Sequence, residues 1–401
     1  MRNQPVHTVY GGAHLFTPET TAKLGAIALK ALREHAPDAA TLAAALAMDK
    51  NLAERIYPRI VAKLEREPVE DYRIDFEDGF GTRPDGEEDD VARKAASAVA
   101  AGLKARTLSA GIGIRIKNLG NETKRRGLRT FELFLSTLVD ASAGALPPNF
   151  VVTLPKITAP EQITTLVDAC ERFESNHSLA RGSLRFEVMI ETPESVFSRD
   201  GRIALPEFLS RGRGRITAAH FGTYDYTAAM GITAAHQGML HPSCDFAKHV
   251  MQVALSGTDV WMSDGATNVM PVGKDRAVIH AAWKLHADQV RHSLVGGFYQ
   301  GWDLHPAQLV TRYAAVFAFF LEGLSAASDR LKNFVQKAAQ ATLVGDVFDD
   351  AATGQGLLNY FLRAMNCGAI SEQEAVEMSG LTVAELQSRS FAKILEGRRQ
   401  T

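Results

Sequence analysis

The sequence predicts an α/β protein built as a (β/α)8 TIM barrel, with an inserted N-terminal helical segment and a C-terminal helical extension. Short apolar runs rich in β-branched residues recur eight times along the chain, and helical periodicity fills most of the gaps between them. Charged residues gather where these runs end. Alternating strands and helices in this number favour a closed parallel barrel, although an open doubly wound sheet would give the same pattern.

The expected strands are short and are separated by Gly, Asp or Asn turns. They are His7–Tyr10, Tyr72–Asp78, Ile112–Asn118, Phe150–Ile157, Leu184–Thr192, Ile216–Phe221, Thr258–Ser263 and Gly297–Trp302. Helical periodicity is clear in Asp89–Arg106, Gly127–Ala143 and Ala159–Glu174. Pro18 and Pro160 are placed as expected for helix starts, because proline is favoured in the first helical turn.

Two helical additions fall outside this repeat. One is Ala39–Glu67, between the first two strands, which we assign to a barrel domain of residues 1–305. The other is a C-terminal extension of residues 306–401, with expected helices Ala307–Leu324, Asp329–Ala341, Gln355–Cys367, Ser371–Met378 and Val383–Leu395. Because such a tail could cap the barrel or pack on another subunit, we expect a homo-oligomer.

Composition limits the partners. A chain of 401 residues with a net charge of −2 has no basic excess, so we expect neither nucleic acid nor an anionic membrane as a partner. The three cysteines are far apart, which is typical of a reducing compartment. The N-terminus lacks the apolar core of a signal peptide, and the apolar stretch Tyr313–Leu321 is too short to cross a bilayer. These features predict a cytoplasmic protein.

Charged side chains follow the second and third expected strands. Arg73, Asp75 and Glu77 alternate with apolar residues and therefore share one face. Two like charges two residues apart repel unless a cation or donor lies between them, or unless Arg73 pairs with them inside the barrel. Arg115 has a fork that matches a substrate carboxylate. It could equally neutralise Asp75 or Glu77, and both roles could hold at once.

Charged residues also end the next three strands. Lys156 could be a Schiff-base nucleophile, but such a lysine is more often a structural or substrate-orienting cation. Glu191 ends the fifth strand, and Gly222 permits a tight turn that leads to Asp225 after the sixth. Since adjacent strands are about 4.8 Å apart, Glu191 and Asp225 could share one hard cation, Mg²⁺ or Mn²⁺.

A rival zinc site would use four residues that lie close together, namely His236, His241, Cys244 and His249. Their spacings match no standard zinc ligand pattern. Gly238 and Pro242 mark the stretch as a loop. We therefore expect ordinary loop and helix positions for these residues rather than a metal site.

Six of these segments resemble the HpcH/HpaI aldolase and citrate lyase β-subunit superfamily, which includes malyl-CoA-type lyases. In order, they are residues 73–79, 114–118, 154–157, 190–193, 221–226 and 301–308. The resemblance implies a (β/α)8 barrel in which Glu191 and Asp225 bind Mg²⁺ and Arg115 binds substrate oxygens. It implies that Asp75 and Glu77 hold metal-bound waters. The Pro-Gly segment that follows the first strand in many CoA lyases is replaced here by residues 10–14.

We therefore expect a Mg²⁺-dependent carbon–carbon lyase or aldolase that acts through the enolate of a 2-oxo acid or acyl-CoA. The expected catalytic residues are Arg115, Asp75, Glu77 and Lys156, and the expected metal ligands are Glu191 and Asp225. The proton acceptor is left open among Asp78, Asp264, His305, a metal-bound water and an acid from another subunit. A phosphoenolpyruvate-handling enzyme on the same barrel and a non-catalytic binding barrel are the alternatives.

Overall fold

The computed structural model describes residues 3–340 and 351–399. The chain divides into two compact units, a barrel unit (Met1–His35 and Leu64–Arg312) and a helical unit (Ala36–Lys63 and Tyr313–Thr401). This division differs from the expected one. The inserted helices group with the C-terminal helices instead of the barrel, and the boundary follows Arg312 instead of residue 305.

The barrel unit contains eight parallel strands that pair in chain order around the sheet, from β7 back to β1 and then to β8. They are β1 (His7–Gly12), β2 (Asp71–Asp75), β3 (Gly111–Arg115), β4 (Phe150–Leu154), β5 (Arg185–Ile190), β6 (Ile216–Phe221), β7 (Trp261–Ser263) and β8 (Gly301–Asp303). A bridge between Ala266 and Trp302 joins the β7 and β8 ends. The result is a nearly closed barrel, which confirms the expected fold class and excludes the open sheet.

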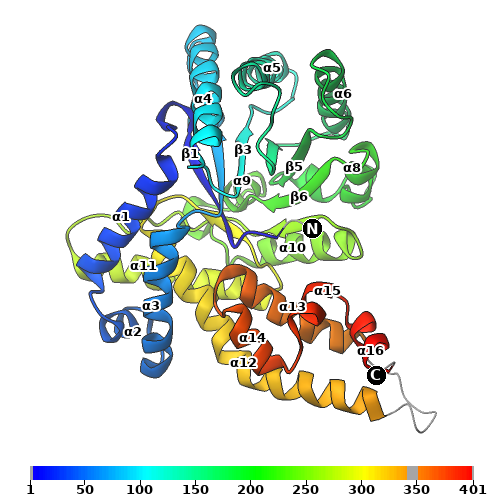
Figure 1. The fold of residues 1–401 in the computed structure, drawn as a ribbon. Coiled ribbons are helices and arrows are strands. Elements are labelled where there is room, and N and C mark those ends of the chain that lie inside the picture. Colours follow the sequence, from blue (N-terminus) through cyan, green and yellow to red (C-terminus); the bar gives the residue numbers. More distant parts are fainter. Residues whose placement is uncertain (1–2, 341–350, 400–401) are drawn as a thin grey trace. The chain divides into compact units, whose positions relative to one another are not determined.

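Helices on the outside cover the strands (Figure 1). They are α1 (Thr20–His35), α4 (Asp85–Ala105), α5 (Lys124–Ala141), α6 (Glu161–Asn176), α7 (Pro193–Val196), α8 (Leu205–Arg211), α9 (Thr223–Ala229), α10 (Pro242–Leu255) and α11 (Arg276–Val295). Local signals fix several starts, because Pro160 precedes α6 and the Thr192 side chain caps α7 together with Ser195. The longer helices bury an apolar stripe, such as Ala92, Ala96 and Val99 of α4.

The centre of the barrel is held by buried ion pairs. Arg73 donates from Nε and Nη2 to the two carboxylate oxygens of Glu187, both at 2.7 Å. Its Nη1 donates to Asp71 at 2.6 Å, and Thr153 donates to Glu187 at 2.6 Å. Arg73 therefore belongs to the barrel interior, which is the structural alternative that its strand pattern left open.

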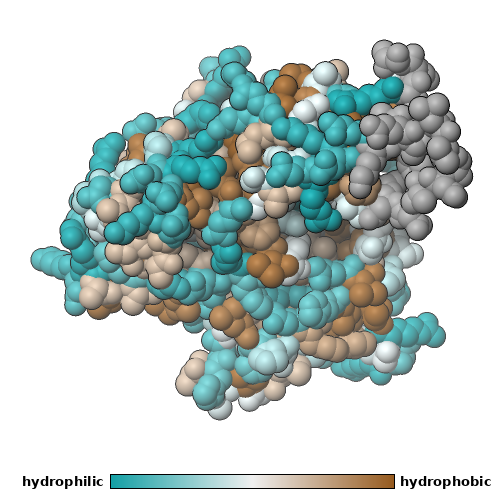
Figure 2. Space-filling model, turned by 90° about the horizontal axis from the view of Figure 1, so that it is seen from below, coloured by the Kyte–Doolittle hydropathy of each residue, from teal (hydrophilic) through white to brown (hydrophobic). Residues whose placement is uncertain are grey.

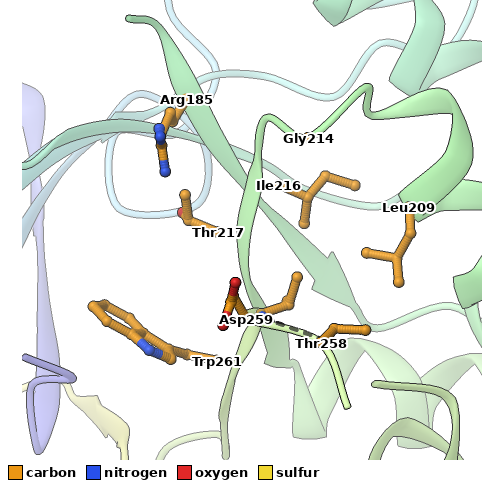
Figure 3. Close-up of a pocket in the computed structure, with 9 residues that line it drawn as sticks. Arg185, Leu209, Gly214, Ile216, Thr217, Thr258, Asp259 and Trp261 are labelled. Carbon is orange, nitrogen blue, oxygen red and sulfur yellow. Dashed lines mark hydrogen bonds between the residues drawn. The ribbon is translucent and has the colours of Figure 1, made fainter. Parts of the chain in front are cut away.

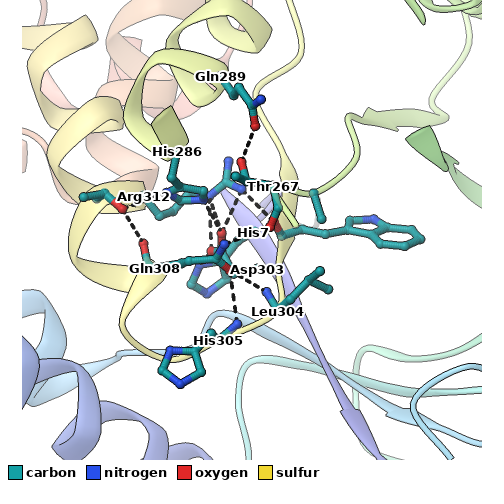
Figure 4. Close-up of polar contacts among 12 residues, drawn as sticks. His7, Thr267, His286, Gln289, Asp303, Leu304, His305, Gln308 and Arg312 are labelled. Carbon is teal, nitrogen blue, oxygen red and sulfur yellow. Dashed lines mark hydrogen bonds and ion pairs between the residues drawn. The ribbon is translucent and has the colours of Figure 1, made fainter. Parts of the chain in front are cut away.

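A second buried cluster ties β8 to the surrounding helices (Figure 4). Asp303 accepts hydrogen bonds from His286 at 3.0 Å and from Arg312 at 2.9 Å, and it lies 2.9 Å from the His7 ring. Burial alone would raise the pKa of Asp303, but Arg312 and the two histidines hold it well below its ordinary value. Gln308 accepts the backbone N–H groups of residues 304 and 305. The segment 301–308 thus closes the barrel structurally.

The helical unit contains α2 (Ala39–Leu46), α3 (Lys50–Arg66), α12 (Gln308–Gln340), α13 (Ala351–Cys367), α14 (Glu372–Ser379), α15 (Val383–Ser388) and α16 (Phe391–Arg399), although α3 and α12 extend beyond it. The two helices expected at 307–324 and 329–341 form the continuous helix α12, and residue 341 lies outside the described residues. The expected helix 383–395 is instead two helices, because Arg389 adopts a left-handed conformation (φ 52°).

Among the helices of the described residues, one is long and apolar enough to cross a membrane by length and composition. It is the part of α12 over Gln308–Gln336. Its most apolar window is 72% buried inside the structure, which is typical of the core helix of a soluble protein. On the face shown in Figure 2, hydrophobic residues form separate small groups among hydrophilic ones. Scattered exposed apolar residues of this kind are ordinary for a soluble surface.

Within the helical unit, Arg59 of α3 pairs with Glu374 of α14. The guanidinium donates at 2.6 and 3.0 Å to the two carboxylate oxygens and at 2.9 Å to the carbonyl of Ala369. Arg59 and the backbone N–H of Ser371 lower the pKa of Glu374 from 4.5 to about 2, against the opposing effect of burial. This pair links the inserted helices to the C-terminal helices within the unit.

Glu374→Gln is expected to lower the free energy of unfolding by about 1 kcal/mol at pH 7, since the pair is partly solvent-exposed. A depressed pKa stabilises the fold only while the carboxylate is charged. The deficit should therefore be complete above pH 4.5 and should shrink as the pH falls toward about 2. Urea unfolding at several pH values measures it, with the exposed Glu377→Gln as control. A deficit independent of pH would contradict this account.

Candidate active site

A cavity of about 390 Å³ lies at the carboxyl ends of the barrel strands, the end at which such barrels carry their active sites. Its polar wall includes four acids from three strand ends, Asp75, Asp78, Glu191 and Asp225, together with Arg115. The structure therefore brings both expected metal ligands and the expected substrate-binding arginine to one cavity. The roles of these residues stay predictions.

Glu191 and Asp225 face the cavity from neighbouring strands. Glu191 directly follows β5, and Asp225 lies in the first turn of α9, immediately after β6. Glu191 is buried, and its Oε1 accepts the backbone N–H of Lys156 at 2.7 Å. Burial and the negative charge of Asp225 raise the pKa of Glu191 to about 8. Two carboxylates that repel each other at the edge of a cavity favour a bound cation.

Gly222 allows Glu191 to reach this position. The sequence predicts that this glycine permits a tight turn, but the structure gives a different reason for it. Its φ of −106° is open to any residue, so no left-handed turn requires glycine here. A Cβ atom at Gly222 would instead lie 2.4 Å from Oε2 of Glu191. Glycine is required at this position because the carboxylate packs directly against the backbone.

Arg115 is fixed by a bidentate pair with Asp75. Nε donates to Oδ1 at 2.7 Å and Nη2 donates to Oδ2 at 2.6 Å, while Nη1 lies 3.2 Å from Glu77 Oε2. Asp75 also accepts the backbone N–H groups of Glu77 and Gly79, at 2.9 and 2.7 Å. Asp75 therefore orients the guanidinium and shapes the turn after β2. This is the alternative role of Arg115 given above, in which it neutralises Asp75 or Glu77.

Lys156, just after β4, contacts the acids of the β2 turn. Its ammonium contacts Glu77 and lies 2.9 Å from Oδ1 of Asp78. Burial opposes charge on Lys156, but these carboxylates dominate and raise its pKa. The balance at Glu77 is different. Burial raises the pKa of Glu77 to about 7, and the positive charges of Arg115 and Lys156 oppose this shift. Because a Schiff-base nucleophile must be a neutral amine, this setting favours the cation role of Lys156 over covalent chemistry.

Aromatic residues that the sequence did not single out form the other wall. Tyr10 and Trp302 lie with their ring centroids 4.4 Å apart, packed on Met189 and Ala266. The indole N–H of Trp302 donates to Nδ1 of His220 at 2.9 Å. Tyr10 begins the segment that replaces the Pro-Gly of the resembling CoA lyases, and this departure was the available signal for it.

The three side chains considered as proton acceptors lie in different surroundings. Asp264 is buried and bound to Lys248 at 2.9 Å and Ser293 at 2.6 Å, so it anchors the end of β7. His305 accepts the N–H of residue 307 through Nδ1, and burial lowers its pKa. Asp78 lines the cavity and its side chain is 57% exposed. Of these three, the geometry favours Asp78.

Two of the four residues of the rival zinc site serve other purposes. His241 caps α10, and the thiol of Cys244 is buried and contacts the carbonyl of Gly238. Across residues 3–340 and 351–399, no group of three or more His, Cys, Asp or Glu side chains is arranged to hold a metal ion. The pair Glu191 and Asp225 fits Mg²⁺ in a different way, since this ion commonly takes one or two carboxylates and fills its other positions with substrate oxygens and water.

A larger cavity of about 640 Å³ lies at the opposite end of the barrel, at the amino ends of β5, β6 and β7 (Figure 3). Arg185, Thr217, Asp259 and Trp261 line it. The amino ends of barrel strands ordinarily serve stability, and catalytic residues come from the carboxyl ends. The smaller cavity is therefore the candidate active site in spite of its size.

Solved structures with the same fold include several enzymes. A citrate lyase from Burkholderia xenovorans LB400 matches with a TM-score of 0.58 and 18% identity, over 94% of this chain and 96% of that one. Haloferax volcanii malate synthase matches in its magnesium/glyoxylate complex with a TM-score of 0.53 and 15% identity, over 100% of both chains. Its pyruvate/acetyl-CoA ternary complex matches with a TM-score of 0.51 and 15% identity, over 100% of this chain and 99% of that one.

At these identities the solved structures show a shared fold. They agree with the resemblance that the strand-end motifs indicate, without establishing membership of that superfamily. A comparison with curated protein sequences finds no match. A family model described as a domain of unknown function, DUF6986, matches residues 1–394. The chain therefore belongs to the DUF6986 family.

Proposed function

We propose that this chain is a Mg²⁺-dependent carbon–carbon lyase or aldolase that acts through the enolate of a small 2-oxo acid. The observation that carries the proposal is that Glu191 and Asp225, from neighbouring strands, line one cavity with Arg115. The two carboxylates repel each other, and a bound dication would offset this repulsion. Their oxygen atoms are the ligands that a hard dication such as Mg²⁺ or Mn²⁺ prefers. The shared fold with a citrate lyase and a malate synthase is consistent with this chemistry.

Each polar residue of the cavity has a role in this proposal. A magnesium ion held by Glu191 and Asp225 would supply Lewis-acid polarisation of the substrate carbonyl. Arg115, held in place by Asp75, donates to the substrate oxygen on which negative charge grows as the carbon–carbon bond breaks. Asp78 takes the proton of the substrate hydroxyl in the cleavage direction, because it is the accessible acid among the candidates.

The size and lining of the cavity favour a 2-oxo acid over an acyl-CoA. About 390 Å³ bounded by Tyr10 and Trp302 suits a small acid with a short apolar end. Two basic residues of α5 are already committed, since Arg126 and Arg129 donate to Asp89 at 2.6 and 2.9 Å. They are poor candidates for binding the phosphates of a CoA nucleotide.

Calorimetric titration of Mg²⁺ with and without pyruvate tests the proposal. The two ligands should bind cooperatively, each raising the affinity of the other by about fivefold or more, because both contact the same site. Retro-aldol release of pyruvate from 4-hydroxy-2-oxo acids should stop in EDTA. Independent binding would favour a non-catalytic barrel, and release of phosphate from phosphoenolpyruvate would favour the other enzyme class.

A further inference from the structure

Lys156 contacts every member of the acidic cluster, which we define as Glu77, Asp78, Glu191 and Asp225. Its backbone N–H donates to Glu191 Oε1 at 2.7 Å. Its ammonium contacts Glu77, lies 2.9 Å from Asp78 Oδ1 and lies 3.7 Å from Asp225 Oδ2. A single residue thus connects both proposed metal ligands with the acids of the β2 turn.

The backbone at Lys156 adopts an unusual conformation. Its φ is +48°, in the left-handed region that residues other than glycine rarely occupy. Such conformations persist where the surrounding structure enforces them, and they concentrate at functional sites. Here the conformation allows the amide to bind Glu191 while the side chain reaches the other three acids. We infer that the position of the ammonium is built into the fold.

The charges around the cluster explain what the ammonium does. Arg115 is committed to Asp75 through two hydrogen bonds, and its Nη1 atom lies 3.2 Å from Glu77 and 3.6 Å from Asp78. Among the described residues, Asp225 pairs with the ammonium of Lys156. Lys156 therefore supplies positive charge at the place where the proposed dication would bind.

We propose that Lys156 is an internal counter-cation that competes with the divalent cation for Asp225 and so weakens its binding to the enzyme without substrate. This inference rests on the proposed function. A bound 2-oxo acid brings a carboxylate that offsets the charge of the ammonium. Lys156 thereby couples tight cation binding to the presence of substrate, and the long 3.7 Å contact to Asp225 is the one that the cation would replace.

Mn²⁺ binding without substrate tests this directly, with free Mn²⁺ measured by electron paramagnetic resonance at pH 8. Lys156→Met should bind Mn²⁺ about tenfold more tightly than the wild-type chain, because a like charge is removed close to the dication. The gain in Mn²⁺ affinity that pyruvate produces should be smaller in Lys156→Met than in the wild-type chain.

Two controls separate this effect from others. Lys156→Arg keeps the positive charge and should bind Mn²⁺ within about threefold of the wild-type affinity, as expected if charge decides the competition. Lys94→Met removes one positive charge from an exposed position on α4 and should leave Mn²⁺ affinity unchanged. Circular dichroism and thermal unfolding establish that each variant is folded.

The possible outcomes distinguish the inference from the proposed function. Equal or weaker Mn²⁺ binding by folded Lys156→Met overturns the inference, and a weaker value would make Lys156 an organiser of the acids. If neither the wild-type chain nor Lys156→Met binds Mn²⁺, with or without pyruvate, the proposed function fails too. Binding by Lys156→Met alone would support the inference strongly.

Discussion

Asp225→Asn is expected to lower metal-dependent carbon–carbon cleavage by about 1,000-fold, since a Lewis-acid metal contributes several kcal/mol of transition-state stabilisation. Glu191→Gln is expected to have an effect of similar size. Neither change should unfold the protein, because each replaces an acid by an amide of similar shape and removes one of two repelling charges. Both variants should also lose measurable Mn²⁺ binding, which separates loss of the metal from loss of chemistry.

Asp259→Asn is the matched control, because Asp259 lines the larger cavity at the other end of the barrel. It should keep wild-type activity and Mn²⁺ affinity. Pyruvate release from a panel of 4-hydroxy-2-oxo acids, together with Mn²⁺ titration and thermal unfolding, measures all three variants. Full activity of Asp225→Asn would remove the metal from the mechanism, and inactivity of Asp259→Asn would direct attention to the larger cavity.

Local pattern predicted the barrel strands well but placed their ends poorly. The strand at residues 216–221 was predicted without error, whereas the second was expected to continue to Asp78 and ends at Asp75. The alternation of apolar and charged residues does continue through Phe76 and Glu77. The chain nevertheless turns there, because the Asp75 carboxylate accepts the backbone N–H groups of Glu77 and Gly79. Such side-chain to backbone bonds cannot be read from periodicity.

The candidate site was predictable where residues follow strand ends, and unpredictable where it depends on the closed barrel. Glu191, Asp225 and Arg115 stand beside strand ends in the sequence, so the fold class alone brings them together. The wall formed by Tyr10 and Trp302 requires the first and last strands to meet, with the two rings 4.4 Å apart. No local pattern encodes that distance.

Glu187→Gln is expected to lower the free energy of unfolding by about 3–5 kcal/mol, because it removes one of the two carboxylates that compensate the fully buried guanidinium of Arg73. Glu187 also accepts from Thr153 and lies 3.2 Å from the Nε2 atom of His220. A similar change in an exposed pair, such as Glu65→Gln beside Arg33, should cost less than about 1 kcal/mol. Urea unfolding measures both.

The double variant Arg73→Met, Glu187→Met tests how much a stranded buried charge costs at this place. Asp71 loses its pair with Arg73 in both Arg73→Met and the double variant, so these two are compared. If desolvation of the stranded Glu187 carboxylate dominates, the double variant should be more stable than Arg73→Met. It should nevertheless be less active. The Glu187 carboxylate faces the ring of His220, whose other nitrogen accepts the indole N–H of Trp302 in the wall of the cavity. Stability restored without activity would show that this buried pair positions the aromatic wall. Recovery of both stability and activity would show that the pair only fills the barrel interior.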